Sequence, residues 1–99
     1  MPTYSVARLA ESDLKSIIRF TLKTWGRAQA KCYSQDLRKC FQLLADSPSI
    51  GRSCEPIHTG LHRHEHGKHV VFYVPLRGEV LIVRVLHQQM IPTKIHFEQ

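Results

Sequence analysis

The chain has 99 residues, enough for one hydrophobic core and too few for a second domain, so residues 1–99 are expected to form a single domain. Fourteen lysines and arginines against eight aspartates and glutamates give a formal net charge of +6, which indicates an acidic partner, either nucleic acid or protein, unless the charge serves only solubility. Three cysteines without CxxC spacing, no apolar leader and no run of about 18 apolar residues argue against a disulfide framework, export and a membrane span, so we expect a cytoplasmic protein.

The first half of the chain predicts a short strand over residues 3–9 and then a helical hairpin. Each helix is marked by apolar residues at spacings of three and four: Leu14, Ile17, Ile18, Leu22 and Trp25 in the first, and Ala30, Tyr33, Leu37, Phe41 and Leu44 in the second. Gly26 separates the helices, because glycine readily adopts the left-handed conformation that closes a helix, and Pro48 ends the second. We expect Cys32 and Cys40, on the second helix, to pack in the core.

The second half predicts a connecting loop over residues 49–59 and strands over residues 61–66, 69–74 and 80–87, joined as hairpins. The tail, residues 88–99, is polar and irregular, with room for one final helical turn. The order predicts an α+β fold with an N-terminal strand, a two-helix hairpin and then a three-stranded antiparallel sheet packed on the hairpin. Because residues 70–74 are apolar on both faces, we expect the sheet face away from the helices to expose an apolar binding patch.

Residues 80–86 form the most apolar run and predict a central strand covered on both faces. Strict alternation along this strand predicts two faces: Leu81, Val83, Val85 and His87 on one, and Val80, Ile82, Arg84 and Leu86 on the other. A guanidinium among apolar neighbours is costly without a partner. Arg84 therefore either pairs within the fold or faces a site where an acidic group docks.

All seven histidines lie in the second half of the chain. His62, His64 and His66 alternate along one predicted strand and would project from one face, a pattern that could bind a transition metal. No cysteine or carboxylate accompanies them at a defined offset, so a solvated, pH-sensitive edge is the favoured interpretation and no metal or cofactor is expected. His87 ends the central strand beside Gln88 and Gln89, either as a general base or, as we favour, as a hydrogen-bonding group that caps the sheet.

Several stretches together resemble ParE-type toxins of bacterial type II toxin–antitoxin systems, in the RelE/ParE superfamily. In the first half these are Ala10-Glu11-Ser12-Asp13-Leu14, Thr24-Trp25-Gly26 and Leu44-Ala45-Asp46-Ser47-Pro48 with Ile50-Gly51-Arg52. In the second half they are Gly60-Leu61, Gly67, His69-Val70-Val71-Phe72-Tyr73 and Val83-Arg84-Val85-Leu86-His87-Gln88-Gln89-Met90. The chain departs from the family at Ile91, where an acidic residue is common, and in its ending around residues 93–97.

The resemblance implies a toxin that inhibits DNA gyrase by trapping it on cleaved DNA and that a ParD-like antitoxin neutralises in a hetero-oligomer. For contact with the target, the candidate residues are Arg63, Arg84, His87, Gln89 and Met90. For contact with the antitoxin, they are Val80, Ile82, Arg84 and Tyr73. No catalytic residue is expected for an inhibitor of this kind.

Two alternatives remain. A ribosome-dependent mRNA endonuclease like the RelE branch needs a base, cations and an acid around the scissile phosphate, for which His87, Arg84, Arg63 and Tyr73 are candidates. A basic DNA-binding module is less favoured, because no helix-turn-helix is recognisable and the hairpin needs its apolar stripe for the sheet.

Overall fold

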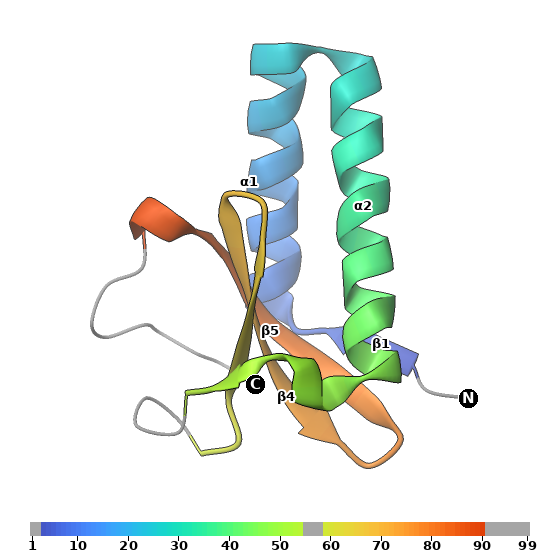
Figure 1. Cartoon of the computed structure of the whole chain (residues 1–99). Helices are drawn as coiled ribbons and strands as arrows, with labels where there is room; N and C mark the ends of the chain where they lie inside the picture. The colour runs from blue at the N-terminus through green and yellow to red at the C-terminus, as the bar shows by residue number, and fades with distance from the viewer. Residues whose placement is uncertain (1–2, 55–58, 91–99) are drawn as a thin grey trace.

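The computed structural model describes residues 3–54 and 59–90 and shows an α+β fold in which a helical hairpin stands on a sheet (Figure 1). Its elements in chain order are β1 (Thr3–Val6), α1 (Arg8–Trp25), α2 (Arg27–Asp46), the 3₁₀ turn η1 (Pro48–Ile50), β2 (Arg52–Ser53), β3 (His62–His66), β4 (His69–Leu76), β5 (Glu79–His87) and the 3₁₀ turn η2 (Gln88–Met90). The predicted fold class is confirmed, and η2 is a helical turn at the start of the tail, whose residues 91–99 lie outside the described part.

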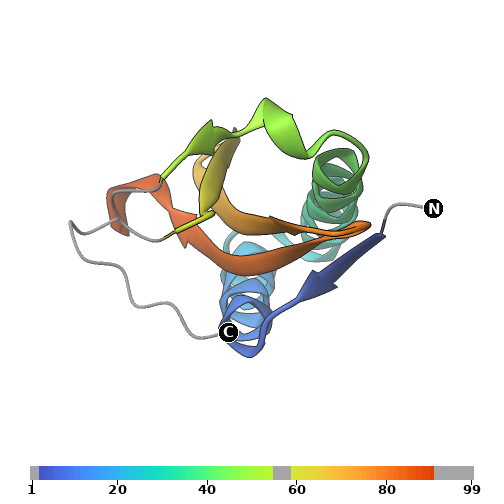
Figure 2. The ribbon, with the colours of Figure 1, turned by 90° about the horizontal axis from the view of Figure 1, so that it is seen from below.

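The described strands form one five-stranded sheet in the order β1-β5-β4-β3-β2, seen from below the helices in Figure 2. The prediction of three antiparallel strands was incomplete. β1 joins the sheet parallel to β5, with Thr3 opposite Glu79, and β2 adds two residues at the other edge inside the predicted loop. A parallel pair needs a long crossover, and the helical hairpin supplies it.

The turn of the helical hairpin is where the sequence predicts it, but the start of α1 and the burial of the last residues of α1 differ from the prediction. α1 begins at Arg8, so the predicted first strand is three residues shorter, ending at Val6. Gly26 ends α1 with φ of 92°, in the region that favours glycine. Leu22 and Trp25 belong to the predicted core stripe yet remain exposed, because the hairpin extends beyond the sheet (Figure 1).

The main core lies between the hairpin and the sheet. Its buried residues include Leu37, Phe41 and Leu44 from α2, and Tyr73 and Ile82 from the sheet. Cys40 belongs to this core, as predicted, and burial raises the pKa of its thiol to about 11. Cys32 is exposed, so its predicted core position is wrong. Cys32 and Cys40 are eight residues apart, a separation that turns an α-helix by about 80° beyond two full turns, and this places Cys32 off the buried face.

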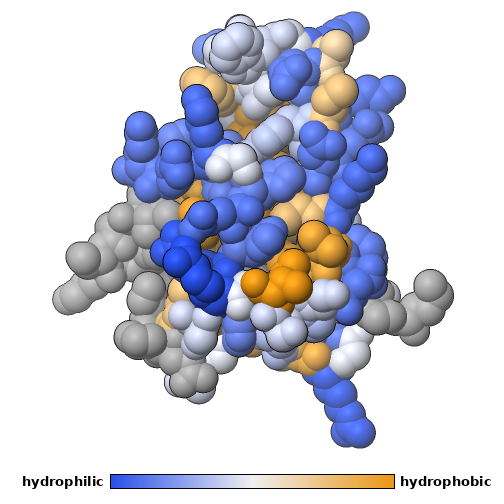
Figure 3. Space-filling model, in the orientation of Figure 1, coloured by the Kyte–Doolittle hydropathy of each residue, from blue (hydrophilic) through white to orange (hydrophobic). Residues whose placement is uncertain are grey.

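The opposite sheet face carries a second buried cluster, so the prediction of an exposed apolar patch there is wrong. The cluster comprises Cys54, Leu61, Val70, Phe72, Val83 and Leu86. Cys54 lies inside the predicted loop and Leu61 just after it, and the Cys54 amide donates to the Leu61 carbonyl at 2.7 Å. On the face seen in Figure 3, the surface is mostly hydrophilic and its apolar atoms form small separate patches.

A β-bulge in β5 reverses the predicted faces of its second half. Phe72 pairs with Arg84 whereas Tyr73 pairs with Ile82, so the register skips Val83. Val80, Ile82 and Val85 consequently face the helices, and Leu81, Val83 and Leu86 face the second cluster. Strict alternation correctly divided residues 80–83, but it failed beyond the bulge because one inserted residue exchanges the two faces.

Asp13 of α1 binds β5 just beyond Ile82, where the pairing of β5 with β1 ends. Arg84 donates to the Asp13 carboxylate through Nε at 2.8 Å and through Nη2 at 2.9 Å, and the Val85 amide donates to the same carboxylate at 3.0 Å. The Arg84 and Asp13 side chains are only 17% and 13% exposed. These hydrogen bonds raise the pKa of Arg84, and they settle its role: it pairs within the fold.

Candidate functional site

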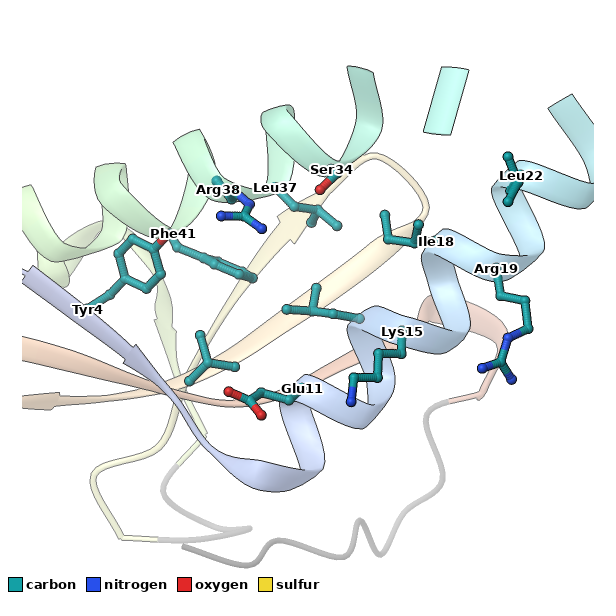
Figure 4. Close-up of a pocket in the computed structure, with 12 residues that line it drawn as sticks. Tyr4, Glu11, Lys15, Ile18, Arg19, Leu22, Ser34, Leu37, Arg38 and Phe41 are labelled. Carbon is teal, nitrogen blue, oxygen red and sulfur yellow. The ribbon is translucent and has the colours of Figure 1, made fainter. Parts of the chain in front are cut away.

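A groove lies between α1 and α2, next to β1 (Figure 4). Its volume is about 760 Å³. It is lined by Tyr4, Val6, Glu11, Leu14, Lys15, Ile18, Arg19, Leu22, Ser34, Leu37, Arg38 and Phe41. We call it the hairpin groove. Sequence reasoning missed it, although the faces that form it have helical spacing.

The hairpin groove has an apolar floor because the face of each helix that lines it borders on the main core, to which Leu37 and Phe41 of α2 belong. On α1 this face repeats at Glu11, Lys15, Ile18 and Leu22, and on α2 at Ser34, Leu37, Arg38 and Phe41. Phe41 is buried, and the ring of Tyr4 on β1 packs edge-on against it with centroids 5.4 Å apart. Leu22 is 46% exposed at the upper end of the groove.

The rim of the hairpin groove is basic. Its charged lining residues are three cations, Lys15, Arg19 and Arg38, and one carboxylate, that of Glu11 (Figure 4). An apolar floor with cations along its rim is the shape and charge that an amphipathic helix with acidic flanks can fill. The groove therefore suits an acidic protein segment.

A second polar cluster lies where β5 ends and joins residues that the sequence did not connect. The Tyr33 hydroxyl of α2 is hydrogen-bonded to His69 Nδ1, and the ring of His69 meets that of His87 with centroids 5.4 Å apart. His66 lies against Tyr33 with centroids 5.9 Å apart. Burial, and then the neighbouring His87 and His66, lower the pKa of His69, and burial raises the pKa of Tyr33. This arrangement favours the neutral form of His69.

His87 acts within this cluster as a hydrogen-bond acceptor. The backbone amide of Gln89 donates to His87 Nδ1 at 3.1 Å, so this nitrogen carries no proton and the ring proton is on Nε2. The Gln88 amide donates to the Lys68 carbonyl at 2.9 Å and fixes the start of η2 to the β3–β4 turn. In this geometry His87 holds the end of β5, while the side chain of Gln89 is exposed and that of Met90 lies outside the described part.

The four residues considered for RNA cleavage do not meet at one place. Arg84 is bound to Asp13, and Arg63 lies on β3 three positions from His66, with its guanidinium carbon 5.9 Å from the centre of the Phe72 ring. The Tyr73 hydroxyl is committed within the fold, where it donates to the Pro48 carbonyl at 2.7 Å and accepts from the Gly51 amide at 3.0 Å. A common active site for these residues is not formed.

The candidate antitoxin contacts are internal. Tyr73, Val80 and Ile82 are fully buried in the main core, and Arg84 is held by Asp13, so none of the four offers a side chain to a partner in this structure. Tyr73, Val80 and Ile82 lie on the sheet face that the hairpin covers, and antitoxin contact with these residues stays a prediction. The partner of Arg84, Asp13, is 71 residues away in the chain, and no local pattern links them.

The alternating histidines of β3 face the helix side of the sheet and are half-buried. His62 packs against Tyr73 with ring centroids 5.6 Å apart, and its Nδ1 lies 3.0 Å from the Gly60 carbonyl. The prediction that they share a face holds, but the description of a solvated edge does not. In residues 3–54 and 59–90, no three His, Cys, Asp or Glu side chains come close enough to hold a metal ion.

No helix among the described residues is long and apolar enough to cross a membrane. Comparison with known proteins identifies one family: residues 4–92 match the ParE toxin of the type II toxin–antitoxin system parDE. Toxin ParE1 of Caulobacter vibrioides is 38% identical over 91 residues, covering 91% of this chain and 93% of that protein. Toxin ParE of Escherichia coli is 33% identical over 91 residues, covering 91% and 88%.

A solved structure has the same fold. A chain of the chromosomal ParDE TA system from P. aeruginosa superposes with a TM-score of 0.70 at 19% sequence identity. The match covers 88% of this chain and 95% of that one.

Proposed function

The chain belongs to the ParE toxin family of type II toxin–antitoxin systems, and from this premise we propose that residues 1–99 form one cytoplasmic toxin domain that inhibits DNA gyrase. We further propose that a ParD-like antitoxin neutralises it by placing an amphipathic, acidic helix in the hairpin groove. The observation that supports this antitoxin site is the groove itself, which has an apolar floor and a basic rim beside the edge strand β1.

The groove fits this partner better than the sheet does. Leu14, Ile18 and Leu22 leave part of their surface accessible along one side of the groove, whereas the apolar residues on both central faces of the sheet are buried. An inserted helix would remove this apolar surface from water at roughly 25 cal/mol per Å², and its acidic flanks would meet Lys15 and Arg38. Affinity is thus supplied mainly by the floor, and partner choice mainly by the rim.

For contact with gyrase we propose the end of β5 and the turn that follows it, with His87, Gln89 and Met90 as candidates. Gln89 is exposed, and the hydrogen bonds of η2 to His87 and Lys68 hold the backbone there in one position. Arg63 remains a candidate on the other side of the sheet, with its side chain 28% exposed. Arg84 is not proposed again, because its guanidinium holds β5 to α1.

The mRNA endonuclease is the alternative that the experiment must separate. Its candidate base, cations and acid are dispersed over the sheet in this structure, which weighs against cleavage by these four residues. Purified toxin is added to gyrase with plasmid DNA, and separately to ribosomes translating an mRNA. We expect lost supercoiling with accumulated cleaved DNA, and intact mRNA; ribosome-dependent cuts with unaffected gyrase would reject the proposal.

The antitoxin site has a matched pair of variants for its test. Leu22→Glu places a carboxylate in the groove, while Leu43→Glu makes the same change on α2 at a residue of similar exposure, 49%, that does not line the groove. Titration of each purified toxin with the ParD-like antitoxin should show at least tenfold weaker binding for Leu22→Glu, or about 1.4 kcal/mol. Equal binding by both variants would place the antitoxin elsewhere.

A further inference from the structure

The positive charge of this protein is concentrated in one segment. Residues 14–35 contain five of the fourteen lysines and arginines and none of the eight acidic residues, so they carry +5 of the net +6. The five cations recur every four residues: Lys15, Arg19, Lys23, Arg27 and Lys31. The rest of the chain is almost neutral, with nine cations and eight acidic residues.

In the structure this segment is the closed end of the helical hairpin, comprising most of α1, the turn at Gly26 and the first turns of α2. We call it the hairpin end. Figure 1 shows its tip, the turn at Gly26 with the adjoining helix ends, standing clear of the sheet, whereas Leu14, Ile17 and Tyr33 still pack against the main core. In Figure 3 this tip forms the top of the molecule. All five cations are exposed, and none forms a salt bridge or a hydrogen bond with the described residues. Their mutual repulsion is thus not balanced by carboxylates on the hairpin end.

Aromatic side chains stand among these cations. Trp25 is 70% exposed and Phe20 is 66% exposed, the two highest values among the large exposed apolar residues in the described part. Trp25 immediately precedes Gly26, at which an added Cβ would meet no atom within 4 Å, so the turn itself is open. A flat ring that is accessible beside several cations is the combination that stacks on bases while lysines and arginines neutralise phosphates.

We propose that the hairpin end binds nucleic acid through its phosphate backbone, without reading sequence, and that Trp25 contacts the bases or sugars. A polyanion fits the set better than a single acidic helix in the groove, because three of the five cations, Lys23, Arg27 and Lys31, do not line the hairpin groove. Successive cations on α1 are about 6 Å apart along the helix. Duplex DNA offers one phosphate per about 1.7 Å of its axis, so each cation can find a phosphate within reach. The earlier objection to DNA binding also fails here, since Leu22 and Trp25 of the apolar stripe are not used by the sheet.

DNA binding by the hairpin end is independent of gyrase inhibition, but its surface overlaps the proposed antitoxin site. Lys15, Arg19 and Leu22 belong to both the hairpin end and the hairpin groove. If an antitoxin helix fills the groove, it covers two of the five cations. Saturating antitoxin should then weaken DNA binding.

Trp25 is the single tryptophan of the chain, so its fluorescence reports on the hairpin end without a label. Purified protein is titrated with a 20-nucleotide single strand, whose bases are open to stacking, at salt concentrations from 50 to 200 mM. We expect the Trp25 emission to change, with a dissociation constant of roughly 10⁻⁴ to 10⁻⁶ M at physiological salt and a slope of log affinity against log salt of about −3 to −4.

Two triple variants with the same net charge test the location. Lys23→Gln/Arg27→Gln/Lys31→Gln removes three cations from the hairpin end, and Lys39→Gln/Lys68→Gln/Arg77→Gln removes three exposed cations elsewhere. The first should reduce the salt slope by roughly two to three and the affinity at least tenfold, while the second should retain most of both. Circular dichroism melting checks that both remain folded.

Three results would overturn the inference: an unchanged Trp25 signal with DNA, equal losses in the two triple variants, or a response to anionic vesicles or polyglutamate that DNA does not compete away. The last would assign the hairpin end to a membrane or to an acidic protein. None of these results bears on gyrase inhibition, which is measured separately by supercoiling.

Discussion

Asp13→Ala is the sharpest test of how β5 is held to α1. The substitution removes three acceptor contacts at once, two with Arg84 and one with the Val85 amide, at a place where both charged side chains are less than a fifth exposed. Breaking a buried ion pair from one side costs about 3–5 kcal/mol, and leaving a buried amide without its acceptor about 1–3 kcal/mol. Because Arg84 makes a further interaction and the site retains some solvent, we expect the low end, about 3 kcal/mol.

Urea unfolding followed by circular dichroism measures this loss, which for a chain of this size corresponds to a drop in Tm of more than about 10 °C. Asp36→Ala is the control, since it removes an exposed carboxylate from α2 and should change the free energy of unfolding by less than about 0.5 kcal/mol. Asp13→Leu combined with Arg84→Met should recover part of the loss, because it removes both charges. A loss below about 1 kcal/mol for Asp13→Ala would refute the reasoning.

Three further predictions follow from the polar cluster and the cysteines. His87→Gln should keep gyrase inhibition within about tenfold, because a positional hydrogen bond is worth about 1 kcal/mol; a folded variant that loses more than a hundredfold would indicate a general base. Burial lowers the pKa of His69 below 6.5, so the unfolded chain binds a proton at this residue more readily than the folded chain does. The free energy of unfolding should therefore be full above pH 6.5 and fall at lower pH. His69→Gln should flatten that fall in urea midpoints measured between pH 7 and 5, and identical pH profiles for the two proteins would contradict this prediction. Native protein should react with a thiol reagent at Cys32 only, and rapid labelling of the buried Cys40, whose raised pKa of about 11 leaves little thiolate, would contradict the packing of α2.

Local patterns in the sequence determined the elements of this protein. The apolar spacing located both helices, and Gly26 marked their turn. Apolar runs located β4 and β5, and the alternating histidines between turn signals located β3. Helix and strand periodicity depend on residues close in the chain, so these patterns can be read locally. The resemblance to ParE toxins also depended on short stretches in a fixed order, and the family match over residues 4–92 confirmed it.

Only the tertiary structure decided which side chains are buried and which distant residues contact each other. The bulge at Val83 exchanged the two faces of β5, Asp13 found Arg84 across 71 residues, and the second cluster buried a sheet face that alternation alone left open. Trp25 is the opposite case, a residue that was expected in the core and is exposed. Its position in an apolar stripe gave no sign that the hairpin would extend past the sheet. Burial depends on where distant elements end and on how their lengths compare, and the spacing of residues within one element does not carry that information.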